Sequence, residues 1–134
     1  TTFAPCKRRR WYPDILAARE MKKSSSVSWG DIRKIESQTT RNGMNSPIQG
    51  TGADITKEAL IGVRNLIRRY NAEHKEEVAF LLCTVHDAID VEVREDLAYV
   101  FAQEMESIMV ECGNKYVKSV NMEVDTTVTP FWVK

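Results

Sequence analysis

The sequence has no feature typical of a membrane or a secreted protein. None of its apolar runs approaches the roughly 20 residues that a membrane-spanning helix needs. The basic run from Lys7 to Arg10 is not followed by the apolar stretch of a secretory signal. We therefore expect a protein that is not secreted, works in the cytoplasm and has no membrane partner.

Cysteine is scarce and net charge is absent. Cys6, Cys83 and Cys112 lie far apart without a CxxC pair, which argues against a disulfide framework or a zinc site and fits a reducing compartment. The 19 basic and 19 acidic residues cancel, but they are unevenly distributed. Residues 1–41 hold ten Lys/Arg against four Asp/Glu, and residues 42–134 hold nine against fifteen. This asymmetry suits a protein that holds phosphates at one place and cations at another, although a dipolar surface without a function would look the same.

The length of 134 residues predicts one domain with one core. Its first part, residues 1–30, is a basic segment in which a short strand ends at Pro13 and a mobile basic loop surrounds the serine run at 24–26. Its second part, residues 31–134, has the hydrophobic periodicity of helices and strands. The predicted elements are a helix over 31–44, a helix over 46–70, strands over 79–85 and 89–93, a helix over 97–112 and a strand over 120–124.

The second of these helices has a marked start and unusual glycines. Ser46, Pro47 and Gln49 have the residue types of an N-cap, a first helical position and a capping-box partner. Each glycine in the helix weakens it by about 1 kcal/mol relative to alanine, which suggests that something packs close to the backbone. These glycines are Gly50, Gly52 and Gly62.

The order of elements predicts an α+β fold. The apolar run at 79–85 indicates a strand buried on both faces, and the alternation of Ile89 with Asp90 indicates a half-buried strand that returns as a hairpin. The following helix opens with acidic residues and closes at Gly113. We expect an antiparallel sheet, made of the hairpin and the C-terminal strand, with helices packed on one face.

His86 and Asp87 lie at the predicted hairpin turn. An aspartate at a turn is commonly a turn residue, and the histidine beside it is commonly satisfied locally. However, a carboxylate at the solvent end of a rigid strand is well placed to bind a divalent cation, and phosphoryl transfer requires such carboxylates. One carboxylate does not organise two ions, and spacing alone does not place Asp90 or Glu92 at the metal.

A second candidate site consists of Arg41, Asn45 and Gln49, which are spaced four residues apart. On a continuous helix they form a polar stripe, and their donors match the minor-groove acceptors that all base pairs share. Against this interpretation, Pro47 is expected to break or kink the helix, and Gln49 then only caps it. Spacing alone leaves both interpretations open.

These motifs together resemble the palm of a DNA polymerase I-type, family A, enzyme. The run from Arg41 to Asp54 is similar to the family pattern R-x-x-x-N-x-P-[MI]-Q-G-T-x-A-D, and Val85-His86-Asp87 to the motif V-H-D-E. Residues 8–15 resemble G-R-R-R-Y-L-P-D-I, and residues 122–125 with Trp132 resemble the final strand and terminal tryptophan. The resemblance covers nearly the whole chain in the same order.

The resemblance implies a partial palm domain over 1–134 that takes part in DNA-templated transfer of a deoxynucleotide (from a dNTP) to a primer 3′-OH. Asp87 would be one of the two catalytic aspartates that bind the two Mg²⁺ ions, and His86 would contact the primer terminus. The minor groove of the primer–template DNA would be contacted by Arg41, Asn45 and Gln49. The duplex phosphates would be contacted by Arg8, Arg9 and Arg10.

The chain also departs from the family pattern. Ala88 stands where the family usually has glutamate. The first catalytic motif, D-x-S-x-x-E-L-R, which supplies the other aspartate, and the fingers motif have no match. We therefore expect a fragment that is inactive alone and requires a polypeptide that carries this first catalytic motif (motif A), the fingers and the thumb. The alternatives are a non-catalytic DNA-binding module derived from a palm, or an interaction domain with an accidental likeness.

Overall fold

The computed structural model describes residues 2–3, 9–23 and 28–132. Two compact units make up the chain, Thr1–Gly52 and Ala53–Lys134. One long helix, α2 (Trp29–His74), contributes to both units. The loop predicted around the serine run and the phosphate contact predicted for Arg8 lie outside the described residues.

The first unit contains a helix that the sequence did not predict. Strands β1 (Thr2–Phe3) and β2 (Arg9–Arg10) pair antiparallel, and α1 (Pro13–Met21) follows. The short strand predicted to end at Pro13 is confirmed only in part, because β2 ends at Arg10 and does not include Trp11 and Tyr12. Pro13 occupies the start of α1, where its missing N–H would have no helical partner. Two contacts tie α1 and its flanks to α2: the Tyr12 hydroxyl donates to the Asn42 carbonyl at 3.1 Å, and Lys22 pairs with Glu36 at 2.6 Å.

Helix α2 replaces the two helices predicted on either side of residue 45. It is continuous through Pro47, so the predicted capping box is wrong. Pro47 leaves the carbonyl of Gly43 without its helical donor, but neighbouring Met44 and Ile48 are exposed, so water can reach this stretch of the helix. The Thr51 hydroxyl donates to the Pro47 carbonyl at 2.6 Å, which gives that carbonyl an additional partner.

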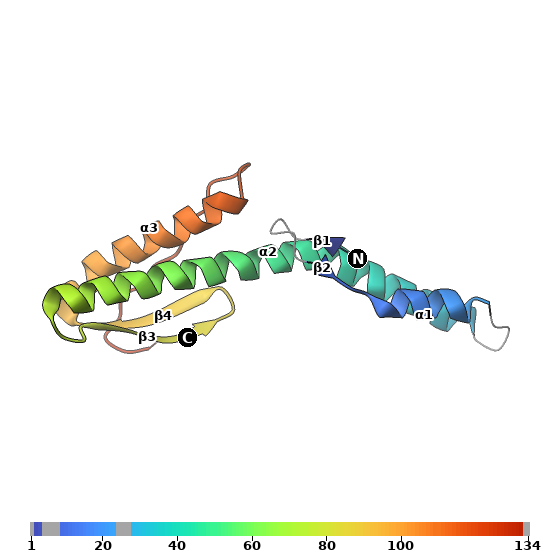
Figure 1. Ribbon diagram of the computed structural model, residues 1–134, viewed down its shortest axis with the longest axis horizontal. Helices are drawn as coiled ribbons and strands as arrows, with labels where there is room; N and C mark the ends of the chain where they lie inside the picture. Colours follow the sequence, from blue (N-terminus) through green and yellow to red (C-terminus); the bar gives the residue numbers. More distant parts are fainter. Residues whose placement is uncertain (1, 4–8, 24–27, 133–134) are drawn as a thin grey trace. The chain divides into compact units, whose positions relative to one another are not determined.

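The second unit contains the hydrophobic core. Strands β3 (Ala79–Val85) and β4 (Ala88–Val93) form an antiparallel hairpin, a 3₁₀ turn (Glu95–Leu97) follows, and α3 (Ala98–Tyr116) runs along the C-terminal half of α2 (Figure 1). Ala59, Val63, Leu66, Ile67 and Tyr70 of α2 are buried at the helical spacing seen in the sequence. The same cluster includes Val78, Ala79, Ile89, Phe101 and Cys112. The fold is α+β, as predicted.

Strand β3 differs from the prediction of a strand buried on both faces. Only Ala79 is buried, whereas Phe80 is 44% exposed and Leu82 is 49% exposed. The pairing explains the difference: Ala79 and Leu81 lie opposite Val93 and Val91, whose side chains pack on the core. Phe80 lies opposite Glu92, on the other face, where both residues are exposed.

The C-terminal segment does not form the predicted strand over 120–124. Within the described residues 117–132 the structure has no strand. The segment instead packs on α3: the Met122 N–H donates to the Asn114 side chain at 3.3 Å, and the Thr126 hydroxyl donates to Glu106 at 3.1 Å. The Met122 side chain lies so close to Gly113 that a Cβ there would be 2.6 Å from its Cγ. Helix α3 was predicted to close at Gly113, but it continues to Tyr116, so Gly113 lies within it.

Candidate functional site

His86 and Asp87 form the two-residue turn between β3 and β4, as the sequence predicted. Both residues are exposed, and Val85 pairs with Ala88 immediately behind them. His86 has φ of 57°, a left-handed conformation that non-glycine residues adopt infrequently. Such a conformation is found at tight turns and also at functional sites, where the surrounding structure holds it. The hairpin thus presents the Asp87 carboxylate to solvent at its tip.

Asn71 of α2 fixes the start of β3. Its side-chain oxygen accepts hydrogen bonds from the Val78 and Ala79 N–H groups, both at 2.9 Å, and its amide donates to the Ala79 carbonyl at 2.8 Å. These three bonds use most of the capacity of one amide side chain. Sequence reasoning missed Asn71, whose only signal is a polar residue one position after the buried Tyr70.

Arg94 fixes the end of β4. Its guanidinium donates two hydrogen bonds to Asp96, at 2.7 Å and 3.0 Å, and it also pairs with Glu76. The hydrogen bonds from Arg94 lower the pKa of Asp96. The Arg94 N–H also donates to the Val78 carbonyl at 2.8 Å, so both strands are held at the base of the hairpin. Sequence reasoning missed this residue too.

The face of the hairpin opposite the core carries Asp90 and Glu92, as the alternation predicted. Asp90 pairs with Cys83 across the strands, and the thiol donates to its carboxylate at 3.2 Å. This hydrogen bond raises the pKa of Cys83. Asp90 is therefore engaged locally, and a bulge between Leu81 and Cys83 brings the two side chains opposite each other.

Asp87 is chemically suited to a hard cation such as Mg²⁺, which prefers carboxylate oxygens. No group of three or more His, Cys, Asp or Glu side chains close enough to hold a metal ion occurs among the described residues. Within this part of the chain Asp87 thus does not belong to a complete metal site.

Arg41, Asn45 and Gln49 lie on the continuous part of α2 in the first unit. All three side chains are exposed. Because α2 passes through Pro47 without a break, residues four apart share one face, so the polar stripe exists. The Arg41 guanidinium donates to the Gln38 side chain at 3.0 Å, which holds it along the helix.

Arg9 and Arg10 are exposed on β2, and the Arg9 guanidinium lies 5.9 Å from the centre of the Trp11 ring. No helix among the described residues is long and apolar enough to cross a membrane.

Comparison with known proteins supports the family that the motifs resemble. The sequence model of DNA polymerase family A matches residues 2–134, nearly the whole chain. The chain belongs to DNA polymerase family A. Its relatives in this family include DNA polymerase I of Aquifex aeolicus, which is 30% identical over 128 residues, a region that covers 94% of this chain and 21% of the relative.

Two further family A relatives show the same pattern of partial coverage. The thermostable DNA polymerase I of Thermus filiformis is 30% identical over 95% of this chain and 12% of its own length. DNA polymerase I of Pseudomonas aeruginosa is 28% identical over 64% of this chain and 11% of its own length. The chain thus spans about a fifth or less of these relatives. No solved structure matches it significantly.

Proposed function

We propose that this chain is the C-terminal palm portion of a DNA-directed DNA polymerase. In this proposal it takes part in transfer of a deoxynucleotide from a dNTP to the 3′ end of a primer. Membership of family A supports a nucleotidyltransferase. The observation that carries the proposal is the hairpin turn, in which Asp87 is exposed at the tip of strands fixed at their base by Asn71 and Arg94.

The proposed role of Asp87 is to bind Mg²⁺. The ions would supply stabilisation of charge on the attacking and leaving oxygens of the transferred phosphoryl group. Asp87 would orient the cation through its carboxylate, and the preceding His86 would contact the primer terminus. The second aspartate of the two-metal site is proposed to come from the motif that this sequence lacks.

The proposed role of Arg41, Asn45 and Gln49 is to contact the minor groove of the primer–template duplex. Their exposure and their common helix face support this role. Because the acceptors in the minor groove are nearly independent of sequence, such contacts suit an enzyme that extends any primer. Arg9 and Arg10, with Arg8, are proposed to contact duplex phosphates.

The chain is proposed to work with a polypeptide that carries the first catalytic motif, fingers and thumb. The partly exposed outer face of β3 supports such an association, since Phe80, Leu82 and Val85 together expose an apolar strip at a strand with an unpaired edge in the described structure. The partner would complete the metal site and cover this strip. Without it, the chain should not extend a primer.

Primer extension by the complete polymerase that contains these residues tests the proposal. Asp87→Ala should reduce the extension rate by at least about a hundredfold, because metal stabilisation of the transition state amounts to several kcal/mol. Asp90→Asn is the matched control: it removes a carboxylate from the same hairpin that is already engaged with Cys83, and it should extend primers at close to the normal rate.

Binding of a labelled primer–template, measured by fluorescence anisotropy, separates the proposal from its alternative. Asp87→Ala should leave this binding largely unchanged, whereas Arg41→Ala should weaken it. If the complete protein binds DNA in a salt-dependent manner but never extends a primer, with or without Asp87, the chain is a non-catalytic DNA-binding module. That result would refute the catalytic role.

A further inference from the structure

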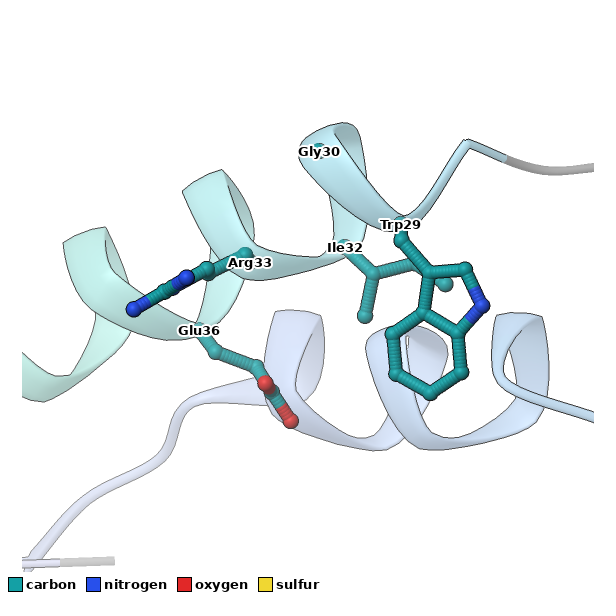
Figure 2. Close-up of a pocket in the computed structure, with 5 residues that line it drawn as sticks. All are labelled: Trp29, Gly30, Ile32, Arg33 and Glu36. Carbon is teal, nitrogen blue, oxygen red and sulfur yellow. The ribbon is translucent and has the colours of Figure 1, made fainter.

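The first unit contains a pocket that none of the proposed catalytic or DNA-binding residues lines. It lies at the start of α2, has a volume of about 450 Å³, and is lined by Trp29, Gly30, Ile32, Arg33 and Glu36. This volume falls within the range of pockets that bind small molecules, about 300–1,000 Å³. Figure 2 shows the Trp29 ring and the Glu36 side chain on the same side of α2 as Ile32, whereas Arg33 extends along the helix.

The walls of this pocket differ in chemistry. Ile32 is 2% exposed and provides a fixed apolar floor, while the Trp29 ring is 73% exposed and offers a flat aromatic face to solvent. A large aromatic side chain that remains so exposed beside a pocket gains little from the folding of its own chain. A flat face of this kind can stack on another planar ring.

The charged side chains of the pocket restrict which ligand could place a planar ring on Trp29. Glu36 is neutralised by Lys22, whose ammonium lies 2.6 Å from its carboxylate. Arg33 forms no ion pair with any residue that the structure describes, so its guanidinium is available to bind an anionic group. Lys34 follows it in sequence and is also exposed. An aromatic wall next to an available cation suits a planar ligand that carries a negative charge.

We infer that this pocket binds an unpaired base of single-stranded nucleic acid, with the base stacked on Trp29 and its phosphate paired with Arg33. Stacking on an aromatic side chain combined with a cationic groove is how single strands are bound without sequence preference. A base within a duplex is already stacked and paired, so it is not available to Trp29. This binding is separate from the proposed minor-groove contacts and does not involve Asp87.

Anisotropy of a labelled oligothymidine of about ten nucleotides tests the inference. Trp29→Ala should weaken binding about tenfold, because stacking of one base contributes about 1–3 kcal/mol and 1.4 kcal/mol corresponds to tenfold. Arg33→Ala should weaken binding less and should also reduce the dependence of binding on salt. The matched control is Trp132→Ala, which removes another exposed tryptophan that does not line the pocket and should change binding less than about twofold.

An oligonucleotide with abasic sites distinguishes base stacking from attraction of phosphates to a basic surface. It should bind the unsubstituted protein about as weakly as oligothymidine binds Trp29→Ala, and the substitution should cause no further loss on the abasic strand. Helicity measured by circular dichroism confirms that each variant is folded. Equal binding of abasic and normal strands, or equal losses for Trp29→Ala and Trp132→Ala, would overturn the inference.

Discussion

The two units of this chain differ in both charge and burial. Residues 42–52 contain no charged side chain, so the first unit holds ten Lys/Arg against four Asp/Glu and the second holds nine against fifteen. Every member of the hydrophobic core cluster belongs to the second unit. In the described part of the first unit, the buried residues are Ala18, Ile32 and Thr39. Folding energy is therefore concentrated in the acidic unit, and the basic unit is mostly surface.

Among the substitutions that test this difference between the units, removal of a core aromatic side chain should reduce the free energy of unfolding most. Phe101 is 1% exposed and meets the Tyr70 ring edge-on, with centroids 5.0 Å apart. Phe101→Ala should reduce the free energy of unfolding by about 3–5 kcal/mol, because it removes buried apolar surface and leaves a cavity. Hydrogen exchange measured by mass spectrometry should show faster exchange in α3 and the hairpin.

Hydrogen exchange in the first unit provides the comparison for this prediction. Exchange in α1, which belongs to the first unit, should change much less than exchange in α3. Equal acceleration in both helices would show that the chain unfolds as one cooperative unit, and that the two units are not energetically separate.

Two glycines of α2, one in each unit, should respond to alanine in opposite directions. At Gly62 a Cβ would lie 2.5 Å from the Cγ2 atom of Ile108, whereas at Gly52 it would meet nothing within 4 Å. Gly62→Ala should reduce stability, since overpacking costs about 1–3 kcal/mol and exceeds the gain in helix propensity. Gly52→Ala should increase stability by up to about 1 kcal/mol. Thermal unfolding followed by circular dichroism measures both, and a gain at Gly62 would show that α3 can move aside.

The smallest expected effect concerns pH. Tyr70 and Arg69 both donate to the Glu104 carboxylate, and these hydrogen bonds lower its pKa. A carboxylate with a lowered folded pKa contributes stability above its unfolded pKa, near 4.3, and loses that contribution as pH falls through the folded value. Glu104→Gln should thus be less stable than the unsubstituted chain at neutral pH. The two unfolding curves should converge below about pH 4, and a constant difference at all pH values would contradict this account.

The sequence predicted those elements whose own periodicity matches their packing. The buried positions of α2 from Ala59 to Tyr70, the hairpin, its turn at His86-Asp87 and most of α3 were all predicted, because each buries one face against neighbours in the same unit. The residues of the polar stripe on α2 were identified from the sequence, but their common helix face was left open because Pro47 was expected to break the helix. The helix instead continues through Pro47.

The remaining elements depend on contacts that sequence patterns do not report. Helix α1 buries only Ala18 and leaves Leu16 exposed, so it shows little hydrophobic periodicity. The alternation at 120–124 has the period of a strand, but Met122 packs on Gly113 instead of extending the sheet. Asn71 and the pocket at Trp29 arise from side chains brought together by tertiary structure. The roles of Asp87, Arg41 and Asn45 in catalysis and DNA binding stay predictions.

Hydrogen bonds hold the base of the hairpin, and the buried Ile89 packs nearer its tip, which has a mechanical consequence. Six residues of β3 lie between Ala79, a hydrogen-bond partner of Asn71, and the turn at His86. The distance from Ala79 to His86 is thus about 23 Å at roughly 3.3 Å per residue. A rotation of about 5° at the base would move the tip by about 2 Å, and misplacement by 1 Å can reduce a catalytic rate about a hundredfold. The position of the Asp87 carboxylate thus depends on the hydrogen bonds at the base of the hairpin and on the packing of Ile89 in the core.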